Sequence, residues 1–484
     1  MFRSIFLVFL TLTVIGSMYM LRFNNKQKNA DSKNQRNLDN NNEAVKRVQH
    51  ASIFWKGLAV QENLRSIFKA PLPANSLASI NGFRAVTTAW IILAHILFFT
   101  MGVTQNMQFM FNYADVWILQ PFYVVIIAVD IFFVIAAFLL SYNFFEEQKK
   151  NKACNLVQST LKRIFMRYLR LAPCFGIALV VSGVLGMYLN DTSQFIPFET
   201  LERNCKKYWW RNLLMIQNFY DPFDMCMTWS WYIAADFQLF AVSSVLLAVS
   251  VVNKKLSVVL GSLIVAMSSI YCGYLGYQHP FNFTGDSMFK SVGILYLQTY
   301  TRCGTYFCGV IAGYYLSAID RKWNVTKQTK NIGWAMSVAI VFCMSFMMKF
   351  GREDNIVVAV FFPAVGRIFW AAAVSFMLLA TSTQHGNGVV SSFFNSKAFI
   401  PLSRLSYYMY IVNPLVIMTL IYSCQTAYQV DFFTIGVEAF GFYCCIIISS
   451  VVAVVLIFNP LEHLINCVLK SDSNSLRQKV NKIE

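Results

Sequence analysis

The chain has 484 residues, of which 57% are hydrophobic and only 13% are charged. Soluble globular proteins average about 25% charged residues, so this composition excludes an ordinary soluble domain and predicts a polytopic membrane protein. The net charge of +17 does not indicate a nucleic-acid partner, because the Lys and Arg residues collect in a few loops between apolar runs and form no basic stripe.

The first apolar run, residues 5–21, is long enough for a short transmembrane helix or for the core of a signal peptide. No small-x-small cleavage site stands out, and the nearby basic residues lie mainly after the run, at Arg22, Lys26 and Lys28. We therefore expect residues 1–21 to be an uncleaved anchor whose end faces the cytosol.

Residues 22–78 then form a cytosolic linker. Its first half is rich in Asn, Lys, Gln and Asp and poor in hydrophobic residues, which predicts disorder. Residues 52–70 have helical periodicity with Lys and Arg, so this segment lies either along the inner membrane surface or against the protein.

Ten further apolar runs predict a core of transmembrane helices, placed near residues 80–100, 122–142, 171–189, 229–251, 256–275, 303–319, 332–348, 356–381, 402–423 and 434–458. With the anchor, the fold class is an all-α polytopic membrane protein of about eleven transmembrane helices. The core domain spans residues 79–465, and a basic tail follows at 466–484.

Loop charges test this alternation of helices. The loops on one side carry most of the Lys and Arg residues, whereas the loops at 101–121 and 424–432 carry none. The positive-inside rule therefore places the basic loops and the C-terminus in the cytosol. Either the plasma membrane or the endoplasmic reticulum fits, since no retention signal ends the chain.

A large polar loop falls on the opposite, outward side. It contains Cys205 and Cys226, which we expect to form a disulfide in an oxidising space, the alternative being two unpaired thiols. The sequon at Asn282 also faces outward and is a candidate glycosylation site. The remaining cysteines show no spacing that would suggest a metal site.

Two ionisable residues share the run at 79–100. Arg84 lies near its start and His95 deep inside it. Eleven residues at about 100° each come within roughly 20° of three full turns, so both side chains lie on one face, about 16 Å apart along the axis. Ionisable residues at membrane depth are costly and mark candidate functional sites.

Several segments resemble one family. Arg84, ten residues and His95 look like the arginine-x10-histidine signature of membrane acyltransferase family 3. Val129-Asp130-Ile131-Phe132-Phe133 is similar to its VDxFF element, and Arg167-Tyr168-Leu169-Arg170-Leu171-Ala172-Pro173 resembles its cytosolic RYxRLxP motif.

The animal branch of that family, the nose-resistant-to-fluoxetine proteins, matches more closely. The segments at 205–219 and 226–238 resemble its CxxxWWxNLLxIxNF and CMxWSWYLAxDxQ elements. Further matches follow in the family's order at 300–314 and 401–407, so the resemblance covers about residues 52–465.

Four departures from the family pattern stand out. A short anchor and linker occupy the place of the large cysteine-rich domain of animal members, and Ala136-Ala137 replaces a usual Ser-Gly. Asn413 stands where a histidine is usual, and Ala234 is the nearest counterpart of a glutamate in bacterial relatives.

The resemblance implies transfer of an acyl group from cytosolic acyl-CoA, without a metal, to a hydroxyl or amine acceptor in or across the bilayer. The acceptor class (lipid, sterol, glycan or protein) stays open. His95 suits general-base work at neutral pH, and Asp130 could orient it or pair an arginine. Arginines at the predicted inner face suit nucleotide phosphates, and the candidates for binding CoA are Arg84, Arg167, Arg170 and Arg404.

Other interpretations of these residues remain. His95 could be a packing residue bonded to a backbone carbonyl, and Arg84 could be a topology anchor. Arg167 and Arg170 could be positive-inside charges only. At the level of function, the alternative to the enzyme is a non-catalytic transporter or lipid-handling protein with the same fold, which Asn413 and Ala136-Ala137 favour.

Overall fold

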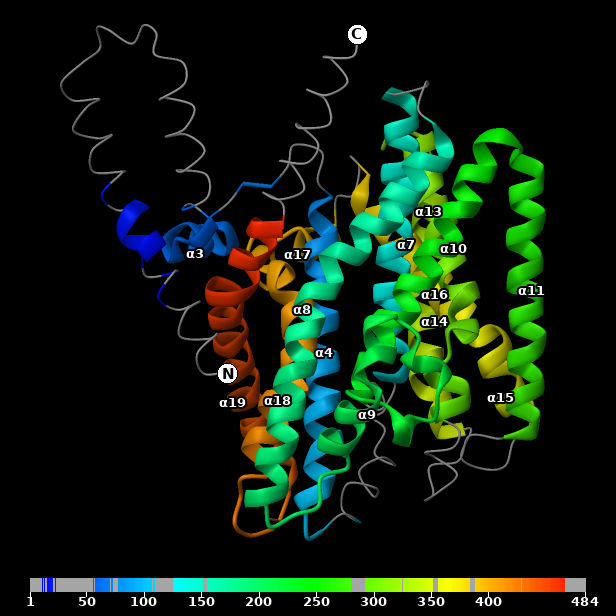
Figure 1. Cartoon of the computed structure of the whole chain (residues 1–484). Coiled ribbons are helices and arrows are strands. Elements are labelled where there is room, and N and C mark those ends of the chain that lie inside the picture. Colours follow the sequence, from blue (N-terminus) through cyan, green and yellow to red (C-terminus); the bar gives the residue numbers. More distant parts are fainter. Residues whose placement is uncertain are drawn as a thin grey trace, which may run out of the picture. The chain divides into compact units, whose positions relative to one another are not determined.

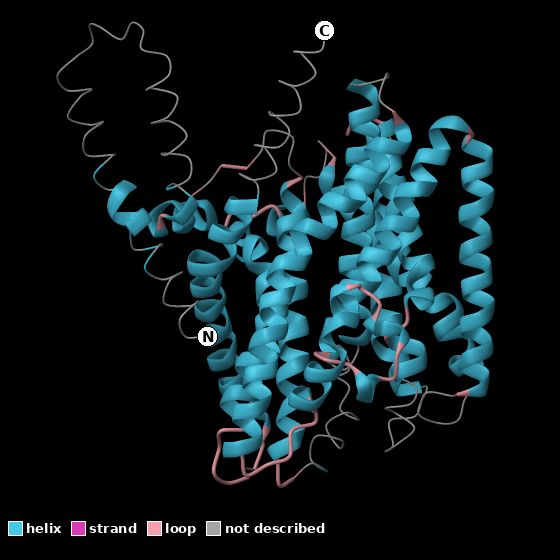
Figure 2. Cartoon of the chain, in the orientation of Figure 1, coloured by secondary structure: helices cyan, strands magenta, loops and turns pink. Residues whose placement is uncertain are grey.

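The computed structural model describes residues 11, 13, 15–20, 22, 55, 57–69, 71–72, 77–106, 108, 125–150, 155–279, 292–323, 325–350, 356–383, 388–427 and 429–465. Their regular structure is helical, with no strand among them (Figures 1 and 2). The helices are α3 (Val60–Phe68), α4 (Ala78–Thr100), α7 (Val125–Lys150), α8 (Leu156–Thr192), α9 (Leu201–Leu213), α10 (Trp231–Val252), α11 (Lys254–Gln278), α13 (Cys303–Ala318), α14 (Lys327–Phe350), α15 (Ile356–Phe361), α16 (Arg367–Ser382), α17 (Val389–Phe394), α18 (Phe399–Ile421) and α19 (Phe432–Ala453).

Within the described residues, nine helices are long and apolar enough to cross a membrane. The predicted all-α polytopic membrane protein is therefore confirmed, while the predicted number of eleven helices stays a prediction. Most of the run at 5–21 lies outside the described residues. α13 has 16 residues, fewer than the roughly 20 that a helix needs to span a bilayer by itself.

The described helices separate into two compact units. The first comprises residues 1–76, 407–409 and 446–484, and the second comprises residues 77–406 and 410–445. The second unit contains the arginine-x10-histidine helix α4 and most of the core predicted for residues 79–465.

α7 is the central helix of the second unit and packs against α4, α10, α13 and α16. Its closest neighbour is α13, because Gly309 and Gly313 let the two backbones touch. A Cβ on Gly313 would lie 2.2 Å from the carbonyl oxygen of Phe138, and one on Gly309 would lie 2.8 Å from the Cβ of Ala137. Small residues four apart are the usual means of such close packing in membranes.

α8 begins 15 residues before the apolar run predicted at 171–189. The basic first half of α8 is helical, although it is too polar for a hydropathy pattern to predict a helix there. The side chain of Asn155 caps the first turn by accepting from the N–H groups of Val157 and Gln158. The helix therefore carries the predicted phosphate-binding arginines on a rigid element.

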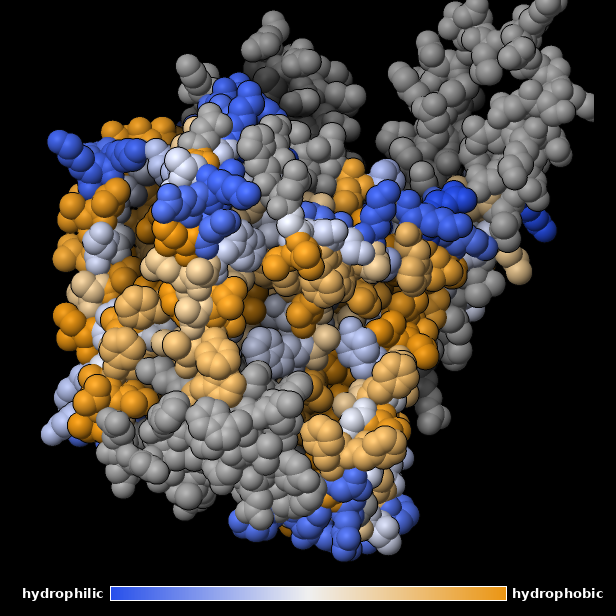
Figure 3. All heavy atoms as spheres, turned by 180° about the vertical axis from the view of Figure 1, so that it is seen from behind, coloured by the Kyte–Doolittle hydropathy of each residue, from blue (hydrophilic) through white to orange (hydrophobic). Residues whose placement is uncertain are grey.

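The outer surface of the second unit is apolar over its middle. Figure 3 shows hydrophobic side chains there, with hydrophilic residues toward the ends. α11 exposes large hydrophobic residues along its length, as expected of a helix that faces lipid: Leu256, Val258, Val259, Leu263, Met267 and Ile270.

In the first unit, α3 packs against a π-helical turn at Val454–Phe458. A π turn leaves a carbonyl without its normal helical partner, and the buried Asn63 Nδ2 donates to the Val455 oxygen at 3.1 Å and to the Gly57 oxygen at 3.1 Å. The amphipathic segment predicted at 52–70 is thus helical over Val60–Phe68 and docked on protein along one face.

Candidate functional site

One hydrogen bond joins His95 on α4 to Asn413 on α18. The His95 Nδ1 atom lies 2.6 Å from the Asn413 Oδ1 atom, and the two residues are 318 positions apart in the sequence. His95 is half-buried, whereas Asn413 is fully buried. The departure from the family's usual histidine therefore lies directly against the predicted base.

Pro414 explains how the Asn413 amide is held. Proline has no N–H, so the carbonyl of Tyr410 four residues earlier has no helical partner. The Asn413 Nδ2 group donates to this carbonyl at 2.8 Å. The other end of the amide, Oδ1, is thereby turned toward His95.

This orientation determines the tautomer of the histidine. An amide oxygen can only accept, so the His95 Nδ1 atom must carry the proton of the shared hydrogen bond. In the neutral ring the Nε2 atom then holds the free lone pair. Asn413 therefore prepares Nε2 of His95 to accept a proton.

Aromatic side chains surround the imidazole. The ring of Phe99 lies 6.3 Å and the ring of Tyr410 lies 6.5 Å from that of His95, between centroids. The Tyr410 hydroxyl donates to the carbonyl of Trp229, so its proton is already committed. These contacts fix the base between α4, α18 and the turn that precedes α10.

A cluster of arginines lies along the same helices. Arg84, on α4, interacts electrostatically with Arg167 and Arg170 of α8 and with Asp236 of α10. Arg167 forms an ion pair with Asp236, and its guanidinium lies 4.2 Å above the ring of Phe240. The structure thus brings together three of the four predicted CoA-binding arginines.

This cluster has a surplus of positive charge. Arg84, Arg167 and Arg170 face one carboxylate, Asp236, which leaves two cations uncompensated among these four residues. Among the described residues, the buried Arg167 Nε and Asp236 Oδ1 atoms also make no hydrogen bond. Planar guanidinium groups with free donors are suited to phosphate oxygens.

Arg404, the fourth predicted arginine, lies on α18 and is half-buried. It precedes Asn413 by nine residues, about 13 Å along the helix, while Arg84 precedes His95 by about 16 Å on α4. The two helices run in the same direction (Figure 1), so Arg404 and Arg84 lie toward the same end of the second unit.

Asp130 pairs with an arginine rather than with His95. Its Oδ1 atom lies 2.6 Å from Arg302 NH1, and both side chains are fully buried. Arg302 NH2 also donates to the Tyr296 carbonyl at 2.8 Å, and Arg367 adds a second positive charge beside Asp130. Of the two roles predicted for Asp130, the structure shows the ion pair.

The loop that is predicted to face outward contains the predicted disulfide. Cys205 of α9 and Cys226 are joined, with sulfur atoms 2.01 Å apart. The side chain of Asn212 donates to the Cys226 carbonyl at 2.8 Å and so holds the loop on α9. The glycosylation candidate Asn282 lies outside the described residues.

Glu199 is a half-buried carboxylate just before α9. Its Oε2 atom accepts from the hydroxyl of Thr228 at 2.7 Å and from the backbone N–H of the same residue at 3.4 Å. Burial raises the pKa of this carboxyl to about 7. Its neighbour Phe198 packs against Phe98, three residues from His95, so this loop lies beyond the histidine end of α4.

A surface pocket of about 410 Å³ lies away from His95, at the C-terminal end of α13. It is lined by residues between Tyr315 and Val325. Nearby, Arg321 Nε donates to the hydroxyl of Tyr142 at 2.8 Å.

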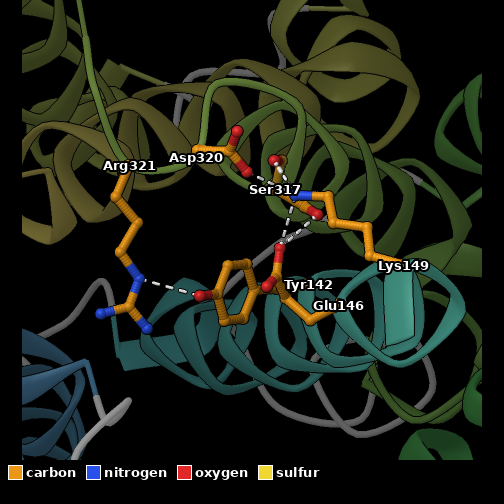
Figure 4. Close-up of polar contacts among 6 residues, drawn as sticks. All are labelled: Tyr142, Glu146, Lys149, Ser317, Asp320 and Arg321. Atoms are coloured by element: carbon orange, nitrogen blue, oxygen red, sulfur yellow. Dashed lines mark hydrogen bonds and ion pairs between the residues drawn. The ribbon is translucent and has the colours of Figure 1, made fainter.

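Lys149 lies in the same region, where the C-terminal end of α7 meets the C-terminal end of α13 (Figure 4). Its amino group donates to Glu146 at 2.8 Å, to Asp320 at 2.7 Å and to the carbonyl of Ser317 at 2.6 Å. A cation on the last carbonyls of a helix is a stabilising C-terminal interaction, so this cluster supports the fold.

The sequence did not identify two residues of the site. The sequence predicts no role for Asp236, although it is a carboxylate inside an apolar run, the same signal that indicates Asp130. It indicates Asn413 only as a departure from a motif. Among the described residues no group of three or more His, Cys, Asp or Glu side chains could hold a metal ion.

The structure is a helical membrane fold in which α4 carries both a histidine and one arginine of a cluster. A family model described as an acyltransferase domain, acyltransferase 3, matches residues 77–459, and the chain belongs to this family. No solved structure matches.

The chain is also similar to the nose resistant to fluoxetine protein 6 of Caenorhabditis elegans. The two are 25% identical over 399 residues. The match covers 75% of this chain and 48% of the relative, so the chain spans about half the length of that protein.

Proposed function

We propose that the protein is a membrane acyltransferase that moves an acyl group from cytosolic acyl-CoA to a hydroxyl or amine acceptor in or across the membrane. The observation that carries this proposal is the His95–Asn413 hydrogen bond, because it leaves Nε2 of a half-buried histidine free to accept a proton. An imidazole N–H inside a bundle needs an acceptor whatever its role, so the functional sign is the other ring nitrogen, Nε2, which makes no hydrogen bond to a described residue.

The arginine cluster supports a nucleotide-phosphate donor. Arg84, Arg167 and Arg170 carry more positive charge than Asp236 compensates, and they lie toward the end that the positive-inside rule assigns to the cytosol. A CoA phosphate bound there would leave the pantetheine arm to extend about 16 Å along α4 toward His95.

The reaction requires few groups. Nε2 of His95 removes the proton from the acceptor hydroxyl or amine as its oxygen or nitrogen attacks the thioester carbonyl. The tetrahedral intermediate then collapses, the carbon–sulfur bond breaks, and the CoA thiolate takes the proton from the imidazolium. Acyl-acceptor and free CoA are the products.

The test is acyl-CoA binding and turnover by the purified protein in lipid nanodiscs, beside His95→Ala. We expect turnover to fall by at least about 10²-fold in the variant, the scale of a lost general base, while acyl-CoA binding is retained. Wild-type protein that neither binds nor turns over any acyl-CoA would contradict the proposal. Binding without turnover would favour the non-catalytic lipid-handling alternative.

A second test concerns the donor site. Arg84→Gln should weaken acyl-CoA binding about 10-fold or more, since a charged hydrogen bond to phosphate contributes about 1.5–3 kcal/mol. Its turnover at saturating acyl-CoA should remain close to that of the wild type. An unchanged affinity would remove Arg84 from the phosphate site without affecting the role of His95.

A further inference from the structure

Tyr232 lies between the surroundings of His95 and the arginine cluster. Its ring centroid is 5.5 Å from that of Tyr410, which in turn is 6.5 Å from that of His95. On the other side, Tyr232 interacts electrostatically with Arg167 and Asp236. It precedes Asp236 by four residues, so both side chains lie on one face of α10, about 6 Å apart along the axis.

The hydroxyl of Tyr232 is available to donate a hydrogen bond to a substrate. Tyr232 is half-buried, and its hydroxyl makes no hydrogen bond to any other residue that the structure describes. The ring itself is tightly held, with Phe133 at 4.8 Å and Phe132 at 5.9 Å between centroids. The phenol is therefore a fixed donor without an internal partner.

Acyl transfer needs such a donor. When a nucleophile adds to a thioester, the carbonyl oxygen becomes an oxyanion that must be stabilised by hydrogen-bond donors. Soluble enzymes often use backbone N–H groups, but inside a membrane bundle these are engaged in the helices. A side chain must therefore supply the proton.

Two other donors close to His95 are committed. The Tyr410 hydroxyl donates to the Trp229 carbonyl, and the Asn413 amide donates to the Tyr410 carbonyl. Arg84 lies about 16 Å along α4 from the histidine, toward the predicted phosphate end. The Tyr306 hydroxyl and the Trp229 indole N–H also lack a partner among the described residues, but both side chains are buried. Tyr232 is half-buried, so its hydroxyl is the more accessible donor between the arginines and the imidazole.

We infer that Tyr232 donates a hydrogen bond to the thioester carbonyl oxygen and stabilises the oxyanion that forms when the acceptor attacks. This inference rests on the proposed acyltransferase function. The carbonyl π electrons move to oxygen as the new bond forms, the phenol keeps its proton and shares it with the oxyanion, and the electrons return as the CoA thiolate leaves.

Tyr232→Phe tests the inference, because it removes the hydroxyl and keeps the ring. We expect turnover at saturating acyl-CoA to fall by about 10²–10³-fold, the effect of removing one oxyanion donor, with the KM for acyl-CoA changed less than about 3-fold. The matched control is Tyr142→Phe, the same change at the α7–α13 junction, which should retain wild-type turnover (Figure 4).

Two further measurements keep the test decisive. Binding of a CoA alkyl thioether, which has no carbonyl, should be the same in wild type and Tyr232→Phe if the variant is folded. Replacing Tyr232 with 4-aminophenylalanine keeps a donor on the ring, so this protein should retain more turnover than one with 4-chlorophenylalanine, which fills similar space without a donor.

The outcomes separate this inference from the proposed function. A wild type with no acyl-CoA turnover rejects both. An active wild type whose Tyr232→Phe variant keeps full turnover overturns only the role of Tyr232. If Tyr232→Phe fails to fold, equal turnover of the amino- and chlorophenylalanine proteins overturns the inference instead.

Discussion

The second unit contains two arginine–aspartate pairs that differ in their surroundings. Asp130 and Arg302 are both fully buried, whereas the exposed fractions of the Arg167 and Asp236 side chains are 26% and 7%. Arg302 is enclosed by aromatic rings, with Tyr296 at 4.9 Å and Trp231 at 5.2 Å from its guanidinium carbon. Arg167 has Arg84 and Arg170 in its surroundings, as Arg302 has Arg367, and both leave a buried Nε atom without a hydrogen bond among the described residues.

The comparison separates a structural pair from a site. Both aspartates have more than one arginine beside them. The Asp130–Arg302 pair is closed to solvent, so it fixes how helices pack, here α7 against the start of α13. A partly exposed pair with surplus positive charge around it is arranged to receive an anion. The same two residue types therefore have different roles, and burial distinguishes them.

The largest expected effect comes from neutralising the two aspartates in turn. Asp130→Asn should lower the free energy of unfolding by about 3–5 kcal/mol, because it leaves Arg302 buried without a counter-charge. Asp236→Asn should cost about 1 kcal/mol or less, since water can reach Arg167. Thermal unfolding of both variants in the same detergent checks this, and equal losses would erase the distinction between the pairs.

Next in size is the effect of the amide that orients the base. Asn413→Leu should reduce turnover by about 10–100-fold, the usual effect of losing a partner that fixes a histidine. Asn413→His should retain more activity, because a ring nitrogen can also accept from His95 Nδ1. Steady-state kinetics at saturating acyl-CoA measures both, and full activity in the leucine variant would exclude a role for the tautomer.

A smaller effect, on the KM for acyl-CoA, is expected at the partly exposed Arg167–Asp236 pair. Arg167→Gln should raise the KM for acyl-CoA by about 10-fold, since one charged contact to phosphate is lost. Arg163→Gln is the matched control, because Arg163 lies one turn away on α8 and pairs with Glu147. A similar rise in KM for both variants would mean that general charge, and not the position of Arg167, attracts the donor.

The smallest expected effect is a pH dependence outside the helices. The pKa of Glu199 is about 7, above the usual 4.5, so the folded protein binds more protons than the unfolded chain between these values. Stability should therefore fall as pH rises from about 4.5 to 7, by about 1 kcal/mol because the carboxylate keeps part of its hydration. Glu199→Gln should flatten this dependence of the Tm, and a parallel slope in the variant would assign it to another group.

The sequence predicted the fold well where hydropathy decides it. Long apolar runs can only be helices in a bilayer, so the helices of the core fell near their predicted places. The first half of α8 was missed because its residues are basic and lie outside the apolar run. Its helicity depends on capping and propensity, which a hydropathy pattern does not contain.

Sequence patterns predict which site residues share one helix, but not which residues meet from different helices. Arg84 and His95 share one helix, so their spacing alone places them on one face. Asn413 lies 318 residues from His95, and no periodicity connects residues on different helices. A signal did exist in Pro414, which frees a carbonyl and so predicts that a neighbouring polar side chain will be fixed there.

The glycines of α13 have a consequence for motion. With Gly309 and Gly313 seated against the backbone of α7, these two helices cannot slide or rotate past each other without a collision between main chains. A substrate that must enter the bundle therefore has to displace other helices. The α7–α13 pair is therefore a rigid part of the second unit, against which α4, α10 and α16 pack.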